Sequence, residues 1–175
     1  GGTMRARARL LERIARHEDV AQVLAEVARF VDPEAPERVD VVAVRDGRAV
    51  RRVTALGSGG DPDGRAPVPL PPALRAVLEA GDAPTGVELA EGDGWPAERA
   101  AWAAERPGAR WSAVPISGDG DGRVGAVIRF AEPGARDDDA ETRLREAASL
   151  AGIALRQTDL VDRLRHRAFH DALTG

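Results

Sequence analysis

The sequence predicts an α/β protein of the α+β type. A mostly antiparallel sheet of five to six strands is expected to carry helices on both faces, with a long helix at the C-terminal end. Short β-branched segments come in pairs around tight turns, and such hairpins build antiparallel sheets. Segments with apolar residues at helical spacing precede, separate and follow these pairs. From about residue 138, some thirty residues run without proline, which is long for a globular helix.

The composition indicates one folded domain with extensions. The chain has 175 residues, and 43% of them are hydrophobic, which is enough for a core. Only 3% are aromatic, so the core is expected to consist mainly of aliphatic side chains. Because the chain contains no cysteine, it cannot form disulfides, thiolate metal sites or a thioether link to a chromophore.

Charge and hydropathy limit the kinds of binding partner and the cellular location that are expected for this segment. Every basic residue is Arg and the net charge is −4, with no basic stripe interleaved with aromatic residues. This pattern argues against nucleic-acid binding. No apolar run reaches transmembrane length, and no signal-peptide segment is recognisable. We therefore expect a cytoplasmic location and no direct membrane contact for this segment, while an upstream membrane anchor stays open.

Two helices are expected before the first strand. The first lies within residues 1–18, of which Gly1–Thr3 are interpreted as a cloning remnant. Asp19 is expected to cap the second helix, because its side chain can accept from the first free backbone N–H groups. That helix carries apolar residues at helical spacing and is expected to end at Asp32. These apolar residues are Val20, Val23, Leu24, Val27, Phe30 and Val31.

Two hairpins and two short helices are expected next. Asp46-Gly47 is a strong hairpin signal, and Gly81 is expected to stop the first short helix. The expected order is a strand at 39–44, a strand at 49–56, a loop at 57–69, a helix at 73–80, an edge strand at 85–89, an Ala-rich helix containing Trp102, and strands at 109–116 and 123–130 around a Gly/Asp turn.

A helix over residues 137–170 is expected to follow the domain. Asp137–Asp139 stand at its start, where a helix N-terminus favours negative charge. Its front half offers a wide apolar surface that can pack on the domain. Its back half offers only a narrow seam of the kind that two helices share. The seam comprises Ile153, Gln157, Leu160 and Leu164.

The seam predicts a parallel homodimer. The domain ends before the seam, so a second copy is expected to cover it along residues 150–168, joined by the first helix. Gln157 costs stability on an apolar seam, but it can fix the register of the two helices.

The final residues carry a resemblance. Asp171-Ala172-Leu173-Thr174-Gly175, at the end of a long helix, resembles the start of a GGDEF (diguanylate cyclase) domain. The resemblance implies that residues 171–175 begin a truncated GGDEF domain, whose catalytic signature lies beyond them. The simpler alternative is a helix C-terminus capped by Gly175. His170-Asp171 also resembles a histidine-kinase phosphoacceptor helix.

Residues 19–136 carry a second, wider resemblance. Gly108-Ala109-Arg110-Trp111-Ser112-Ala113-Val114-Pro115-Ile116, followed by Gly125-Ala126-Val127, resembles a GAF sensor domain. The order of elements agrees with that family, although a PAS domain shares parts of it. The resemblance implies a ligand between the sheet and the middle section, residues 56–104. The candidate pocket residues are Thr54, Trp95, Trp102, Arg110, Trp111 and Ser112. The alternative is that the tryptophans only fill the core.

No other motif predicts chemistry in this chain. The three histidines, His17, His166 and His170, lie outside the expected sheet, so no haem or metal site is predicted. Asp61–Gly64 and Asp119–Gly122 lack the further ligands of a calcium loop and are interpreted as turns. We expect no cofactor, hence no absorption in the visible range.

The expected function is that of a GAF-type sensory module controlling a C-terminal diguanylate cyclase through a dimeric linker helix. The segment itself is not expected to be an enzyme or to make cyclic di-GMP from GTP. A small-molecule ligand is expected but not identified. The alternatives are a ligand-free dimerisation module, or the sensor of a histidine kinase or transcription regulator.

Overall fold

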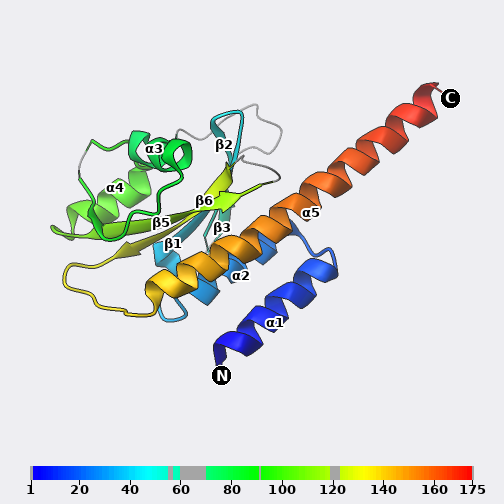
Figure 1. The fold of residues 1–175 in the computed structure, drawn as a ribbon. Helices are drawn as coiled ribbons and strands as arrows, with labels where there is room; N and C mark the ends of the chain where they lie inside the picture. The colour runs from blue at the N-terminus through cyan, green and yellow to red at the C-terminus, as the bar shows by residue number, and fades with distance from the viewer. Residues whose placement is uncertain (1, 55–56, 60–69, 91, 119–122, 175) are drawn as a thin grey trace.

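The structure is a computed structural model, and it describes residues 2–54, 57–59, 70–90, 92–118 and 123–174 (Figure 1). The elements are α1 (Gly2–Ala15), α2 (Val20–Val31), a 3-10 turn (Pro36–Arg38), β1 (Val39–Arg45), β2 (Arg48–Thr54), β3 (Gly57–Gly59), α3 (Pro72–Ala80), β4 (Val87–Glu88), α4 (Ala97–Ala104), β5 (Arg110–Ser117), β6 (Arg123–Ala131) and α5 (Ala140–Thr174).

The six described strands form one sheet in the order β3-β2-β1-β6-β5-β4, and every neighbouring pair is antiparallel. The predicted fold class is therefore confirmed. One expectation was wrong: Gly57–Gly59, expected to lie in a loop, form edge strand β3. Gly-Ser-Gly offers no alternation of apolar and polar residues that a sequence pattern could show. The rest of that expected loop, residues 60–69, lies outside the described residues.

The first hairpin has the predicted turn. Asp46 and Gly47 both have positive φ, at 53° and 74°, as a two-residue type I′ turn requires. This turn matches the twist of the strands, so β1 and β2 pair directly. The turn expected between β5 and β6 contains residues 119–122, which lie outside the described part of the chain.

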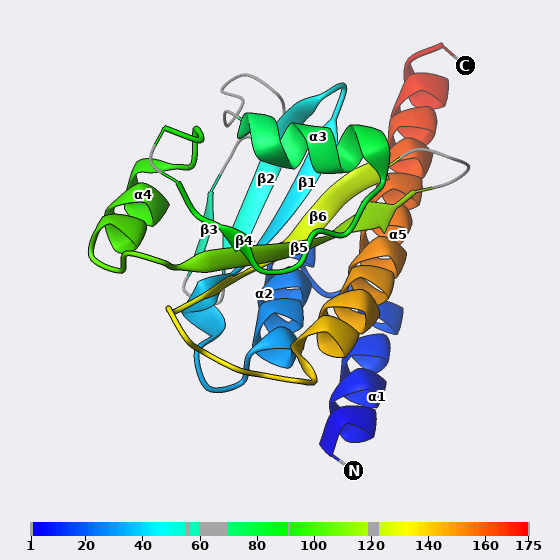
Figure 2. The same ribbon diagram turned by 60° about the vertical axis from the view of Figure 1, so that its left-hand side comes forward.

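The helices cover both faces of the sheet (Figure 2). α2 and the front half of α5 pack on one face, with α1 against both helices. α3 and α4 lie on the other face. The first core holds chiefly Leu, Val and Ile side chains, as the composition predicts, and the second gathers the tryptophans.

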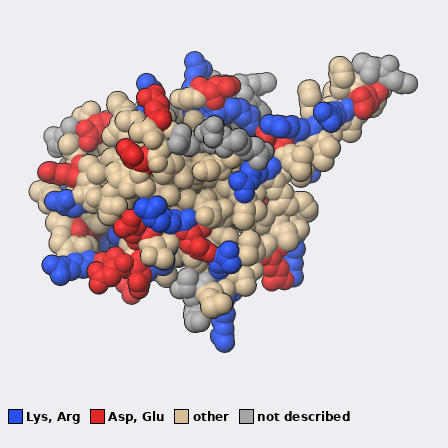
Figure 3. All heavy atoms as spheres, in the orientation of Figure 1, with Lys and Arg blue, Asp and Glu red and all other residues tan. Residues whose placement is uncertain are grey.

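α5 changes character along its length. Its front half is buried on the sheet through Leu144, Ala147, Leu150 and Ala151, and Ala154 is buried against α1 and α2. Its back half projects beyond the domain, and its last residues stand clear of the rest of the molecule (Figures 1 and 3). One helix is thus packed in the domain at its front end and exposed to solvent at its back end.

Small residues allow α5 to approach the sheet closely. A Cβ added at Gly152 would stand 3.2 Å from the Ser117 carbonyl oxygen. At the start of α5, the Asp137 carboxylate accepts a hydrogen bond from Asp139 N at 3.2 Å and pairs with Arg143. Asp137 thus closes a local turn just before α5 begins at Ala140, and the capping role of Asp137–Asp139 stays a prediction.

No described helix is both long enough and apolar enough to cross a membrane. The described residues also hold no group of three or more His, Asp or Glu side chains arranged to bind a metal ion. On the face shown in Figure 3, charges of both signs are interspersed over most of the described surface.

Candidate ligand-binding face and linker helix

The three tryptophans meet on the α3/α4 face of the sheet. The ring of Trp95 stands edge-on to Trp111, with centroids 5.3 Å apart, and edge-on to Phe130 at 5.2 Å. Trp102 lies 6.4 Å from Phe130. The structure therefore brings together the three aromatic residues predicted for the pocket, around a phenylalanine from β6.

Two of these tryptophans have a buried indole N–H group without a hydrogen-bond partner among the described residues. The indole Nε1 atoms of Trp95 and Trp111 are buried and find no hydrogen-bond partner among the described residues. A buried indole N–H normally finds an acceptor, since leaving it unpaired costs free energy. These two donors are therefore the groups on this face that a ligand with acceptor atoms would satisfy.

A buried charge cluster lies beside the tryptophans. Asp40, only 2% exposed, accepts hydrogen bonds from Arg52 Nε and Nη2 on one oxygen, both at 3.2 Å. Its other oxygen accepts from Arg99 Nη2, also at 3.2 Å. The sequence interpretation missed this cluster. The available signal was Asp40 itself, a lone carboxylate in an otherwise apolar strand, which implies a buried partner.

Arg99 joins the charge cluster to the aromatic cluster. Its guanidinium lies 4.0 Å from the Phe130 ring centroid and 5.6 Å from that of Trp102, and it donates to the Glu37 carbonyl. Burial lowers the pKa of Arg99, while the adjacent carboxylate of Asp40 opposes the shift. An arginine keeps its proton at neutral pH even so, so this face holds a permanent, nearly enclosed positive charge.

The three polar candidates lie apart from the tryptophan cluster. Ser112 Oγ accepts from Gly86 N at 2.8 Å, and Arg110 donates to the Gly86 carbonyl, so both hold the segment before β4 against β5. Arg110 is exposed. Thr54 is half-buried at the end of β2. None of the three lines the cavity described next.

The α3/α4 face encloses only a small cavity, of about 20 Å³. That is room for one water molecule. A larger ligand would therefore have to displace α3 or rearrange the tryptophans. The cavity is lined by Asp40, Val42, Ala49, Arg52, Leu70, Pro71, Leu74, Trp95, Pro96 and Ile128.

The four seam residues divide into two pairs. Ile153 packs against Ile14 and Val23 of its own chain. Gln157 Nε2 lies 2.8 Å from His17 Nδ1, at the turn between α1 and α2. Leu160 and Leu164, about one and two turns beyond Gln157, are 57% and 55% exposed. α1 and its turn thus cover the first half of the seam within one chain, and only the second half is open.

Sequence comparisons assign no family: no family model and no curated protein matches this chain. Solved structures do match. The phycoerythrobilin-bound GAF domain of a cyanobacterial phytochrome aligns with a TM-score of 0.60 at 13% identity, over 91% of this chain and 97% of that one.

Two further structures have similar scores. The GAF domain of a phosphoenolpyruvate-protein phosphotransferase from Coxiella burnetii gives a TM-score of 0.58 at 12% identity, over 91% of this chain and 96% of that one. A GAF domain/HD domain protein from Geobacter sulfurreducens gives a TM-score of 0.56 at 18% identity, over 83% of this chain and 98% of that one. The chain therefore has a GAF-like fold, while at these identities the likeness extends to the fold alone.

Proposed function

We propose that the chain is a GAF-type sensory module of a multidomain signalling protein, which acts on its output domain through α5. The observation that carries this proposal is the continuity of α5. One unbroken helix of 35 residues is buried in the domain at its front and exposed at its back. A shift of the front half on the sheet would therefore move the projecting half, since a helix transmits such motion as a rigid element.

The proposed output domain is a diguanylate cyclase. α5 continues through Asp171-Ala172-Leu173-Thr174, the residues that resemble the start of a GGDEF domain, and Gly175 lies outside the described residues. Two catalytic domains that join two GTP molecules must face each other, so a helix that holds two copies together suits this output. The segment itself is proposed to have no catalytic activity.

The proposed input is a small molecule bound on the α3/α4 face. The unpaired Nε1 atoms of Trp95 and Trp111 favour a ligand with acceptor atoms. Both carboxylate oxygens of Asp40 already accept from an arginine, Arg52 or Arg99, so the charge cluster disfavours a cationic ligand. The polar candidates Thr54, Arg110 and Ser112 are not needed for this proposal.

The proposed assembly is a parallel homodimer through the open half of the seam. Leu160 and Leu164 are large apolar side chains, one turn apart and mostly exposed. Covering them with a second copy would bury apolar surface at roughly 25 cal/mol per Å². Ile153 and Gln157 would support this pairing indirectly, by fixing α5 against α1.

A second candidate function is a dimerisation module without a ligand. The specific observation in its favour is the small cavity on the α3/α4 face, where the aromatic rings pack against one another. Retention of a small molecule in native mass spectrometry of the purified chain would exclude this alternative. A histidine kinase or transcription regulator as output is the other alternative, and it shares the same helix.

A chimera tests transmission through α5. The chain is joined to the catalytic domain of a diguanylate cyclase, with Asp171 to Gly175 replacing the corresponding first residues of that domain. Cyclic di-GMP production is then compared with and without two residues inserted after Arg167. Two extra residues rotate the output by about 200°, whereas seven residues nearly restore the original angle.

We expect the two-residue insertion to change the activity at least several-fold and the seven-residue insertion to return it toward that of the parent chimera. Equal activity for both insertions would show that α5 does not transmit orientation. A chimera no more active than the isolated catalytic domain would argue against the proposed pairing with a cyclase.

A further inference from the structure

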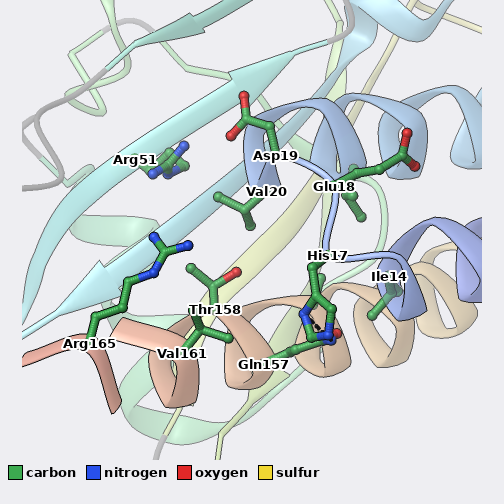
Figure 4. A pocket seen from close by; sticks show the side chains of 12 residues that line it. Ile14, His17, Glu18, Asp19, Val20, Arg51, Gln157, Thr158, Val161 and Arg165 are labelled. Carbon is green, nitrogen blue, oxygen red and sulfur yellow. Dashed lines mark hydrogen bonds between the residues drawn. The ribbon is translucent and has the colours of Figure 1, made fainter. Parts of the chain in front are cut away.

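A second cavity lies where α5 leaves the domain. Its volume is about 360 Å³, within the range of small-molecule sites. It is bounded by the α1–α2 turn, the start of α2, β2 and the middle of α5 (Figure 4). The cavity is therefore separate from the tryptophan cluster, which lies on the opposite face of the sheet.

Two arginines from different elements border this cavity. Arg51 comes from β2 and is half-buried, and Arg165 comes from the projecting half of α5. Figure 4 shows Arg165 extending from α5 toward the strand that carries Arg51. Neither guanidinium forms an ion pair or hydrogen bond with any described residue. Among the described residues, both side chains are therefore free to pair with an anion.

The acidic residues of the cavity are already engaged. Asp19 caps α2, accepting from Ala21 N at 3.4 Å. The Oε2 atom of Glu18 lies 3.7 Å from Arg13 Nε. The four formal charges on the cavity lining sum to zero, but both carboxylates have a local partner, whereas the two guanidinium groups have none among the described residues.

The rest of the cavity combines a polar wall with an apolar floor. His17, held at a φ of 56° and contacted by Gln157, stands at one end, and Thr158 adds a hydroxyl group from α5. This left-handed conformation ends α1: the backbone N–H of His17 donates to the Ile14 carbonyl at 3.1 Å, and that of Glu18 donates to the Arg13 carbonyl at 3.4 Å. The floor consists of Ile14, Val20, Val23, Ala154 and Val161.

We propose that this cavity binds a small dianionic ligand, with Arg51 and Arg165 pairing with its negative charges and Thr158 donating a further hydrogen bond. Phosphate and carboxylate groups share this chemistry, because both accept paired hydrogen bonds from guanidinium groups. Such a ligand would tie β2 to the projecting half of α5. It would therefore act on the helix through which the output is proposed to be controlled.

This site does not compete with the open half of the seam, Leu160 and Leu164. At 3.6 residues per turn, Thr158, Val161 and Arg165 share one side of α5, while Leu160 and Leu164 lie about 100° around the helix. A ligand and a second copy could therefore occupy α5 together. Nothing in this proposal depends on a ligand at the tryptophan cluster.

Calorimetric titration of the full chain at low ionic strength tests the proposal, with inorganic phosphate and succinate as separate probes. We expect saturable binding of at least one probe, and the stronger of the two identifies the anionic group. Arg51→Gln and Arg165→Gln should each weaken binding about tenfold or more, because each removes a charge-assisted hydrogen bond. The matched controls are Arg48→Gln on β2 and Arg167→Gln on α5, which remove the same charge away from the cavity and should leave the affinity unchanged.

Hydrogen exchange supplies a second readout. Bound probe should slow backbone exchange in residues 155–166 of wild type and not of Arg165→Gln. The proposal is overturned if neither probe binds wild type at millimolar concentration. It is also overturned if the control substitutions weaken binding as much as the cavity substitutions do, or if binding leaves exchange in α5 unchanged.

Discussion

At the scale of single residues, the domain depends on a few buried charges. Asp40 stands between Arg52 and Arg99, and all three side chains are largely removed from water. Breaking such a group by removing one partner is costly, because the remaining charges stay buried without compensation. The cluster therefore fixes how α4, which carries Arg99, sits on β1 and β2.

Replacing Asp40 by Asn should destabilise the domain strongly. Asn has the same shape but no charge, so Arg99 loses its ion-pair partner and Arg52 keeps only the exposed Glu98, at 3.7 Å. We expect the free energy of unfolding, measured with urea, to fall by about 3 kcal/mol or more. Asp46→Asn is the matched control, since Asn also tolerates positive φ in the exposed turn, and it should change stability by less than about 0.5 kcal/mol. Equal effects of the two substitutions would contradict a structural role for the cluster.

The start of α5 should respond to acid through Asp137. Desolvation acts to raise the pKa of Asp137, but the hydrogen bond and charge of Arg143 outweigh it and lower the pKa. A lowered folded-state pKa stabilises the fold above the unfolded value of about 4, and this contribution is lost as the pH falls through the folded-state pKa.

Asp137→Asn should therefore cost stability at pH 7, by less than about 1 kcal/mol because the pair is partly exposed. The difference from wild type should shrink toward zero near pH 2. Unfolding curves at both pH values measure it, with Asp138→Asn as a control that removes a neighbouring carboxylate. A deficit that persists undiminished at low pH would show that Arg143 does not act through the ionised carboxylate.

Residue roles were only partly predictable from the sequence. The three tryptophans could be assigned to one face through the resemblance to GAF domains, in which the middle section lies over the sheet. Ser112 and Arg110 could not be placed, because strand alternation does not show that both contact Gly86. The partners of Asp40 lie 12 and 59 residues further along the chain, beyond any local pattern.

At the scale of elements, two glycines allow neighbouring elements to approach closely: Gly125 lies between β6 and β1, and Gly152 lies between α5 and β5. A Cβ added at Gly125 in β6 would stand 2.0 Å from the Val42 carbonyl oxygen of β1. Backbone atoms of a paired strand cannot move aside without breaking the sheet. Gly152 in α5 has more room, with its nearest contact at 3.2 Å.

The two glycines should therefore respond differently to the same substitution. Gly125→Ala should lower the free energy of unfolding by about 2 kcal/mol or more, since the strands must separate. Gly152→Ala should stay within about 1 kcal/mol of wild type, because the gain in helix propensity offsets a tight contact. Urea unfolding measures the free energy of unfolding of both variants. A Gly125→Ala variant as stable as Gly152→Ala would show that β1 and β6 are not paired in this register.

Elements were the most predictable level of this structure. Periodicity and turn chemistry place α2, the first hairpin and α3 near their observed bounds, since each has its own cap or turn residue. β3 escaped prediction because it has no apolar pattern. The sequence also did not predict that the first half of the seam is covered within one chain, because the contact of Gln157 with His17 joins residues 140 positions apart.

At the scale of the whole molecule, a GAF-like domain is joined to a helix that extends past it. The fold follows from the sequence because hairpins and amphipathic helices each have one face to bury. α1 runs beside α5 and holds it through Arg7 and Glu146 as well as through Ile14. The open half of the seam, Leu160 and Leu164, is then the place where a second chain is proposed to join.

This pairing is the step on which the proposed function depends, and light scattering of the purified chain at tens of micromolar tests it directly. Wild type should have twice the chain mass of 18.5 kDa. Leu160→Asp with Leu164→Asp should have the mass of one chain. Phe169→Asp with Leu173→Asp replaces two still more exposed apolar residues on another side of α5 and should remain a dimer. A monomeric wild type, or a Leu160/Leu164 variant that stays dimeric, would contradict the proposed seam.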